Sequence, residues 1–228
     1  MCPKGDARIC KDRPLLGAVI DSEERPKMTR PTRLRILYGV VVVLLIAFAL
    51  SILKASKFSP TVLLVLGLLF LIPGRINGHF WRDFYTGRRM MDSGWNAEAI
   101  RVFEKFLVSV RENPTLKYLI WFVWSFYTRD VEAMTQNNIG AVLIRDGRLD
   151  QAEERLVQAI RIDDQYPIPY YNMALLAELR GDRKAASESL STAEALGYRK
   201  TNIDEIANKA ASILATIEGR KKRPSDDA

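Results

Sequence analysis

Two stretches in the C-terminal half of the chain repeat each other at an interval of 34 residues. Residues 137–163 and 171–197 align without a gap, and small or apolar residues recur at matching positions. The matching pairs are Gly140 and Ala174, Gly147 and Gly181, Ala152 and Ala186, Leu156 and Leu190, and Ala159 and Ala193. A fixed period of this length indicates stacked supersecondary units. Each unit is predicted to be a helix, a glycine-containing turn and a second helix, because glycine ends a helix cheaply with a positive φ.

This spacing resembles the tetratricopeptide repeat (TPR) family, whose unit is a 34-residue helical hairpin. The family has small residues at three fixed points and a large apolar residue between the last two. The resemblance implies units at about 133–166 and 167–200, within a repeat domain that covers 76–219. A less regular unit is expected at about 80–113, where Phe106 replaces the last small residue. The expected fold class is all-α: a short TPR-like α-solenoid of about three helical hairpins, preceded by a membrane hairpin.

An aromatic insertion and a terminal helix complete the expected repeat domain. The insertion, 114–132, contains the run LKYLIWFVWSFY, whose twelve residues are too few to span a bilayer as a helix. It is either a long first helix of the second unit packed on the first unit, a surface resting on the bilayer, or a partner groove anchored by Trp121 and Trp124. Residues 202–218 predict a helix that caps the solenoid. Residues 220–228 are expected to be a disordered tail.

Two uncharged apolar segments precede the repeats. Residues 36–53 form 18 such positions and residues 58–73 form 16, which predicts a transmembrane helical hairpin at 35–75. The alternative is that the first segment is a signal peptide that is cleaved. The polar residues 1–34 are expected to be a disordered basic arm, and Met28 is a second candidate for the start of translation.

The positive charge of the chain lies beside these apolar segments. The net charge is +7, and residues 1–75 account for all of it with 12 basic and 5 acidic side chains. Residues 76–228 carry 22 of each sign, so nucleic acid is not an expected partner. Basic residues flank both segments, whereas the short connection carries only Lys54 and Lys57. The positive-inside rule then predicts both termini and the repeat domain on the cytoplasmic side, in a bacterial cytoplasmic membrane.

Residues that carry catalysis or bind metals are scarce. The chain has one histidine, His79, and its two cysteines, Cys2 and Cys10, lie in the polar arm. It has neither a phosphate-binding glycine loop nor a nucleophile elbow. We therefore expect no catalytic residues, no metal and no cofactor, and a protein that is not an enzyme.

The TPR resemblance implies a scaffold that binds a peptide or helix of a protein partner along its concave surface, next to the lipid bilayer. The positions that would line this surface are Arg88, Asn137, Asn138, Ala141, Ile144, Arg145, Tyr171, Asn172, Leu175, Glu178 and Leu179, with Trp121 and Trp124 added from the insertion. Self-association could complete so small a groove. The alternative function is that of a structural subunit in a larger integral membrane complex, assembled through the hairpin.

Overall fold

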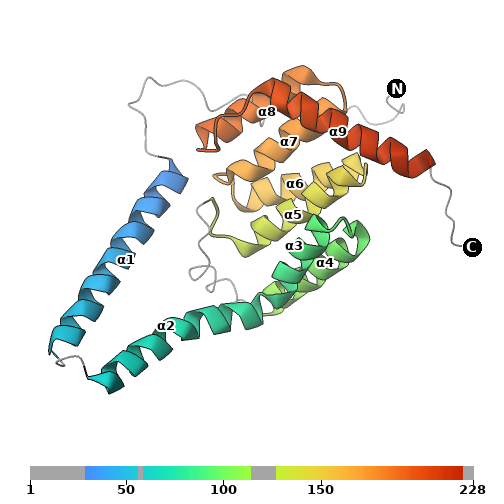
Figure 1. The fold of residues 1–228 in the computed structure, drawn as a ribbon. Coiled ribbons are helices and arrows are strands. Elements are labelled where there is room, and N and C mark those ends of the chain that lie inside the picture. The colour runs from blue at the N-terminus through green and yellow to red at the C-terminus, as the bar shows by residue number, and fades with distance from the viewer. Residues whose placement is uncertain (1–28, 56–58, 114–126, 223–228) are drawn as a thin grey trace, which may run out of the picture.

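The computed structural model describes residues 29–55, 59–113 and 127–222, and every regular element within these ranges is an α-helix (Figure 1). In chain order the helices are α1 (Arg30–Ala55), α2 (Pro60–Phe80), α3 (Arg82–Asp92), α4 (Asn96–Glu112), α5 (Val131–Arg145), α6 (Leu149–Ile162), α7 (Pro167–Leu179), α8 (Arg183–Ala195) and α9 (Ile203–Lys222). The all-helical class is confirmed for these residues. The predictions for residues 1–28, including a start at Met28, for most of the insertion with Trp121 and Trp124, and for residues 223–228 lie outside the described residues.

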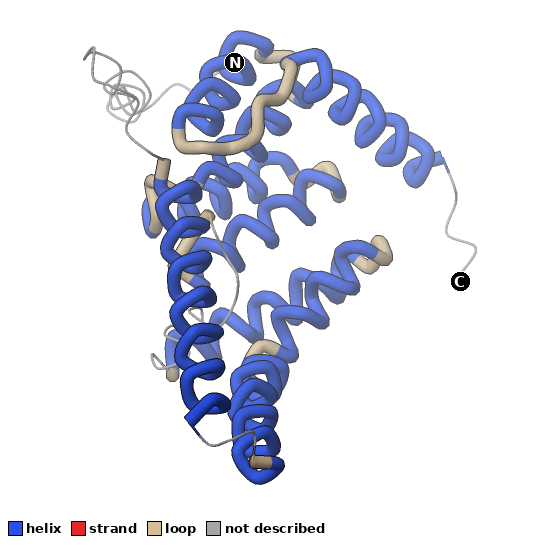
Figure 2. Tube along the Cα trace, turned by 60° about the vertical axis from the view of Figure 1, so that its left-hand side comes forward, coloured by secondary structure: helices blue, strands red, loops and turns tan. Residues whose placement is uncertain are grey.

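Helices α3 to α8 pack as three consecutive pairs. The closest packing is within α3–α4, α5–α6 and α7–α8, and each pair then packs on the next (Figures 1 and 2). A glycine with positive φ joins the helices of each pair: Gly94 (81°), Gly147 (77°) and Gly181 (77°). The residue after each glycine donates its backbone N–H to the carbonyl five residues back, at 2.9–3.0 Å. The three turns therefore share one helix-ending geometry.

Small residues lie where paired helices approach closely. A Cβ added at Gly140 would lie 2.8 Å from the Cγ of Leu156, and one added at Gly87 would lie 2.7 Å from the Cε1 of Phe103. Each glycine thus accommodates the large side chain of its partner helix. In the first pair, Phe106 joins an aromatic cluster with Trp81, which has no exposed surface. The irregular position of the first unit is consequently filled by aromatic packing.

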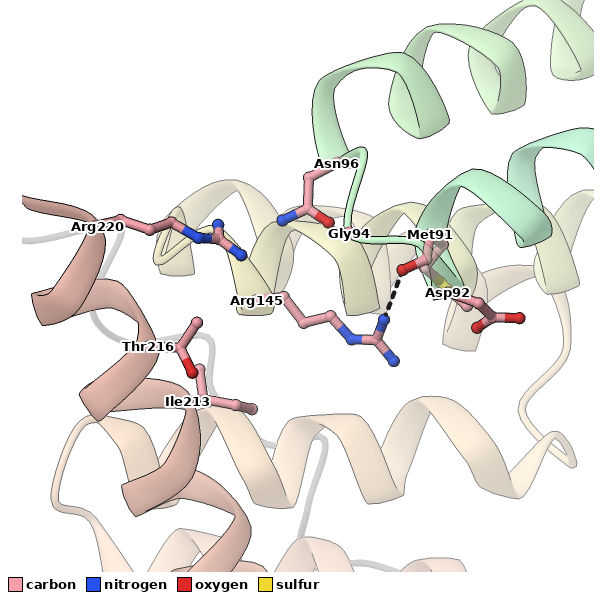
Figure 3. A pocket seen from close by; sticks show the side chains of 8 residues that line it. All are labelled: Met91, Asp92, Gly94, Asn96, Arg145, Ile213, Thr216 and Arg220. Carbon is pink, nitrogen blue, oxygen red and sulfur yellow. Dashed lines mark hydrogen bonds between the residues drawn. The ribbon is translucent and has the colours of Figure 1, made fainter. Parts of the chain in front are cut away.

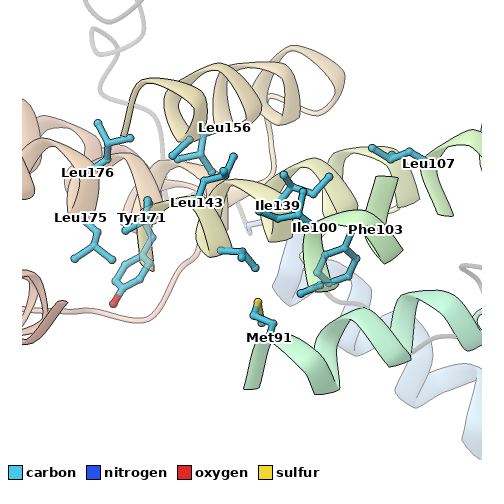
Figure 4. Close-up of a cluster of buried hydrophobic side chains, with 14 of the residues drawn as sticks. Met91, Ile100, Phe103, Leu107, Ile139, Leu143, Leu156, Tyr171, Leu175 and Leu176 are labelled. Atoms are coloured by element: carbon cyan, nitrogen blue, oxygen red, sulfur yellow. The ribbon is translucent and has the colours of Figure 1, made fainter. Parts of the chain in front are cut away.

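One continuous apolar core runs through the helix pairs, and part of it is shown in Figure 4. It extends from Trp81 at the start of α3 to Ala210 in α9. Helix α9 packs mainly on α7 and buries Ile206 and Ala210. The Oδ1 of Asn202 accepts a hydrogen bond from the backbone N–H of Asp204 at 3.1 Å, so this asparagine caps the helix. Helix α9 continues to Lys222, four residues beyond the predicted end of the terminal helix.

The two N-terminal helices diverge from one another. They lie closest where α1 ends and α2 begins and form a V, with the repeat pairs at its open end (Figure 1). Helix α1 has 26 residues, is apolar enough to cross a membrane, and has none of its apolar stretch buried within the chain. Among the described residues it is the helix that meets this test. Helix α2 has 21 residues and continues past the second apolar segment to Phe80, directly before α3. A second membrane span remains a prediction.

Candidate partner-binding site

A small cavity opens between the first helix pair and α9. We call it the notch; its volume is about 260 Å³ (Figure 3). Three parts of the chain contribute to it: the α3–α4 turn, the last residue of α5, and the C-terminal half of α9. Its lining residues are Met91, Asp92, Gly94, Asn96, Arg145, Ile213, Thr216 and Arg220. Residues separated by more than 120 positions in the sequence therefore share one site.

Arg145 connects two walls of the notch. It is the last residue of α5, and its Nη1 donates a hydrogen bond to the backbone carbonyl of Met91 at 2.9 Å (Figure 3). That carbonyl belongs to the last turn of α3, where a helix leaves carbonyl groups without an intrahelical donor. The positive charge also suits the negative end of the helix dipole. One N–H of the guanidinium thus holds its position while the side chain remains exposed.

Asp146 holds the other side of the notch together. Its Oδ1 accepts a hydrogen bond from the Nδ2 of Asn96 at 2.8 Å, and the Nη1 of Arg220 lies 3.2 Å from the same oxygen. One carboxylate therefore links the start of α4, the end of α5 and the end of α9. The Oδ1 of Asn96 is buried and has no hydrogen-bond partner among the described residues.

The formal charges around the notch cancel. Arg145 and Arg220 contribute two positive charges, whereas Asp92 and Asp146 contribute two negative ones. Since long-range attraction requires a net field, the notch has little means to steer a charged ligand from a distance. Its donors and acceptors can select a ligand only at contact range, by shape and hydrogen bonding.

Helix α9 packs against some of the residues that were expected to bind the partner. The Nζ of Lys209 donates a hydrogen bond to the hydroxyl of Tyr171 at 3.1 Å and lies 4.9 Å from the centre of its ring. Farther along α9, a Cβ added at Gly147 would lie 3.1 Å from the Cδ1 of Ile217. The helix thus crosses from α7 to the end of α5, and the notch is the space left between it and the first pair.

Several predicted partner-binding residues lie inside the chain. Asn137 and Asn172 are 3% and 7% exposed, and the Nδ2 of Asn172 donates to the Oδ1 of Asn137 at 2.8 Å. Tyr171, Leu175 and Ile144 are also buried. In the absence of a partner, these five side chains hold α5, α7 and α9 together.

The remaining predicted positions are more accessible. Asn138, Ala141, Glu178 and Leu179 are half-buried, and Arg88 and Arg145 are exposed. Of all the predicted positions that the structure describes, Arg145 is the one that lines the notch.

Arg88 lies near a buried tyrosine and not in the notch. Burial raises the pKa of Tyr166 well above its ordinary value; the positive charge of Arg88 lowers that pKa and the negative charge of Asp163 raises it. Arg88 therefore acts on the corner where α6 meets α7. The two exposed predicted positions therefore lie apart, Arg145 in the notch and Arg88 near this corner.

Sequence reasoning missed most of the notch. Asp92 and Asn96 flank the first turn, and Thr216 and Arg220 belong to the terminal helix. The 34-residue spacing aligns positions within the repeated units, whereas the path of α9 depends on how that helix packs after the last unit. No pattern in the sequence pairs Arg220 with Asp146, which lies 74 residues earlier.

Comparisons with known proteins do not extend this description. No family model matches the sequence, and no curated protein matches it. The resemblance to the TPR family therefore rests on residue spacing.

Proposed function

We propose that this protein is a membrane-anchored scaffold that binds a protein partner at the cytoplasmic surface of a membrane. In this proposal α1 and α2 are the two spans of the predicted hairpin, and the helices from α3 onward are a TPR-like solenoid. Two features support it: the exposed apolar surface of α1, and the shared glycine turn geometry of the three helix pairs. We propose no catalytic role and no cofactor. A bacterial cytoplasmic membrane, with both termini in the cytoplasm, is the location that the flanking charges favour.

The notch is the observation that carries the proposed binding function. Pockets for whole small molecules usually measure about 300–1,000 Å³, and the notch at about 260 Å³ is smaller. It suits one inserted side chain, with the rest of the partner lying on the rim. Trp95 lies in the α3–α4 turn, between Gly94 and Asn96 of the notch lining, and is 61% exposed. Tryptophan is enriched among residues that dominate protein interfaces, so an exposed one at this rim fits a protein partner.

Site-specific photocrosslinking in native membranes tests this function. A photoreactive amino acid at Thr216 lies in the notch, and the same group at Ala211 lies on the face of α9 that points away from it. We expect a discrete crosslinked partner from Thr216 and none from Ala211. Equal crosslinking from both positions, or none from Thr216 in membranes that contain the folded protein, contradicts the proposal.

A second candidate function uses the hairpin itself. Val43, Leu44 and Phe48 of α1 are 63–65% exposed, so this helix offers apolar surface to either lipid or other membrane helices. A structural subunit of a larger integral membrane complex would bury that surface against other spans. A photoreactive group at Val43 distinguishes the two functions. Crosslinks to other membrane proteins favour the subunit, and crosslinks to lipid alone favour the scaffold.

A further inference from the structure

The first turn of α1 is docked on the repeat helices, unlike the rest of α1. Leu34 is 3% exposed and Pro31 is also buried, whereas Ile36 and Leu37 are 52% and 45% exposed. Burial therefore ends where the uncharged apolar run at 36–53 begins. The part of α1 that contacts the repeat helices is the part that would lie outside a bilayer.

A buried carboxylate anchors this turn. The side chain of Asp163, at the end of α6, is 8% exposed and forms an ion pair with the Nη1 of Arg30. The ion pair uses the Oδ1 of Asp163, which also accepts a hydrogen bond from the backbone N–H of Gln165 at 3.3 Å. The Oδ2 accepts a hydrogen bond from the hydroxyl of Thr128. A buried charge is costly unless it is paired, so Asp163 favours the position in which Arg30 reaches it.

A glycine permits the close approach on the other side. Gly197 follows α8 with a φ of 94°. A Cβ added there would lie 2.7 Å from the Oγ1 of Thr29 and 3.3 Å from the Cγ of Pro31. Gly181 has a similar φ of 77°, but a Cβ added there would meet nothing within 4 Å. The two glycines are thus alike in backbone conformation and differ in whether α1 lies against them.

We infer that the corner formed by Asp163, Thr128 and Gly197 is a docking site for the first turn of α1 from the same chain, and that this docking fixes how the repeat helices face the membrane. The inference rests on the proposed role of α1 as a membrane anchor. The repeat helices have a second attachment where α2 meets α3, because Trp81 is fully buried against Phe106 there. Two attachments at opposite ends remove the rotation that a single tether would permit. The notch then opens in one fixed direction relative to the bilayer.

The intact chain in lipid nanodiscs allows a direct test by pulsed electron paramagnetic resonance. Spin labels are placed on Thr32→Cys of α1 and Ser187→Cys of α8, both exposed, after Cys2 and Cys10 are replaced by serine. We expect one narrow distance distribution between the labels. Dilution with unlabelled chains leaves it unchanged if the docking is within one chain.

Two substitutions and their controls test the site itself. Gly197→Ala broadens the distribution because its Cβ collides with α1, whereas Gly181→Ala, which has the same kind of backbone strain, leaves it narrow. Arg30→Asp and Asp163→Arg each broaden it, and the double variant restores the narrow distance. Each of these results supports the inference when circular dichroism shows that the variant retains its helices.

Three results would overturn the inference. They are a broad distribution in the parent chain, equal effects of Gly197→Ala and Gly181→Ala, and loss of the distance on dilution, which would assign the site to α1 of a second copy. Failure of the proposed function is observed separately. It appears as a protein that is not recovered with membranes, or as a notch that gives no crosslink, whereas the label distance reports docking alone.

Discussion

Substitution of Asn137 tests whether the buried asparagine pair holds the repeat helices together or serves a partner. Its Oδ1 accepts a hydrogen bond from the Nδ2 of Asn172 at 2.8 Å, and both side chains are almost fully buried. Asn137→Ala leaves the Asn172 donor buried without an acceptor, which costs about 1–3 kcal/mol. A central value of about 2 kcal/mol lowers the Tm of a domain of this size by about 4–8 °C.

The neighbouring residue provides a matched control. Asn138 lies one position later on α5, and its Nδ2 is already buried without a hydrogen-bond partner among the described residues. Asn138→Ala therefore removes no hydrogen bond donated by the Nδ2, and we expect the free energy of unfolding to change by no more than about 0.5 kcal/mol. The double variant Asn137→Ala/Asn172→Ala should cost about 1 kcal/mol less than the sum of the single variants, because residues in contact couple by about 0.5–3 kcal/mol.

Thermal unfolding of the full chain in detergent, followed by far-ultraviolet circular dichroism, measures these differences. Crosslinking from Thr216 in the same variants, at a temperature where they are folded, reports partner binding. If Asn137 holds the helices together, Asn137→Ala lowers the Tm and retains the crosslinking. An unchanged Tm with crosslinking abolished would refute it and would make Asn137 a partner contact.

Three further predictions concern packing, pH and surface charge. Gly140→Ala should destabilise the fold by about 1–3 kcal/mol because its Cβ would collide with Leu156. Gly219→Ala should not, because a Cβ added there meets nothing within 4 Å. Equal melting temperatures for the two variants would contradict the close approach of α5 to Leu156 of α6. Burial raises the pKa of Tyr166 in the folded chain. The neutral Tyr166 hydroxyl therefore contributes fully to stability below its unfolded pKa of about 10, and this contribution is lost as the pH rises through the folded pKa. Tyr166→Phe should reduce the fall in Tm between pH 9 and pH 11, and an unchanged fall would count against this explanation. Arg180 bridges two carboxylates at the surface, and Arg180→Ala should cost less than about 1 kcal/mol; a larger loss, or one unaffected by added salt, would contradict surface pairing.

The regular part of the fold was predictable because local rules determine it. The turn glycines at 147 and 181 indicated where the paired helices end, and both have positive φ in the structure. The uncharged run at 36–53 likewise indicated a long apolar helix, which α1 is. Such features depend on residues close in sequence, where periodicity and capping are informative.

The candidate site was less predictable because it depends on packing between distant segments. Asn138 and Asn172 match a polar position common in the TPR family, but in the structure Asn172 donates its hydrogen bond to Asn137, one residue away from the position that the 34-residue spacing pairs with it. Arg220 is part of a basic run that looked like a solvated tail, and its ion pair with Asp146 arises only because α9 crosses the end of α5. Of the predicted partner contacts in the described residues, Arg145 reaches the notch because it ends its helix beside the turn that follows α3.

The docking of α1 has a consequence for the order of folding. Arg30 and Asp163 are separated by 133 residues, and Gly197 lies farther along the chain still. Closing so long a loop carries an entropic cost that must be met before the contact contributes any stability. During synthesis the first helix also emerges long before the corner that receives it. The first turn of α1 therefore lacks its docking corner until α6 to α8 have formed, and in the proposed membrane-anchored scaffold this docking is the closing step of folding.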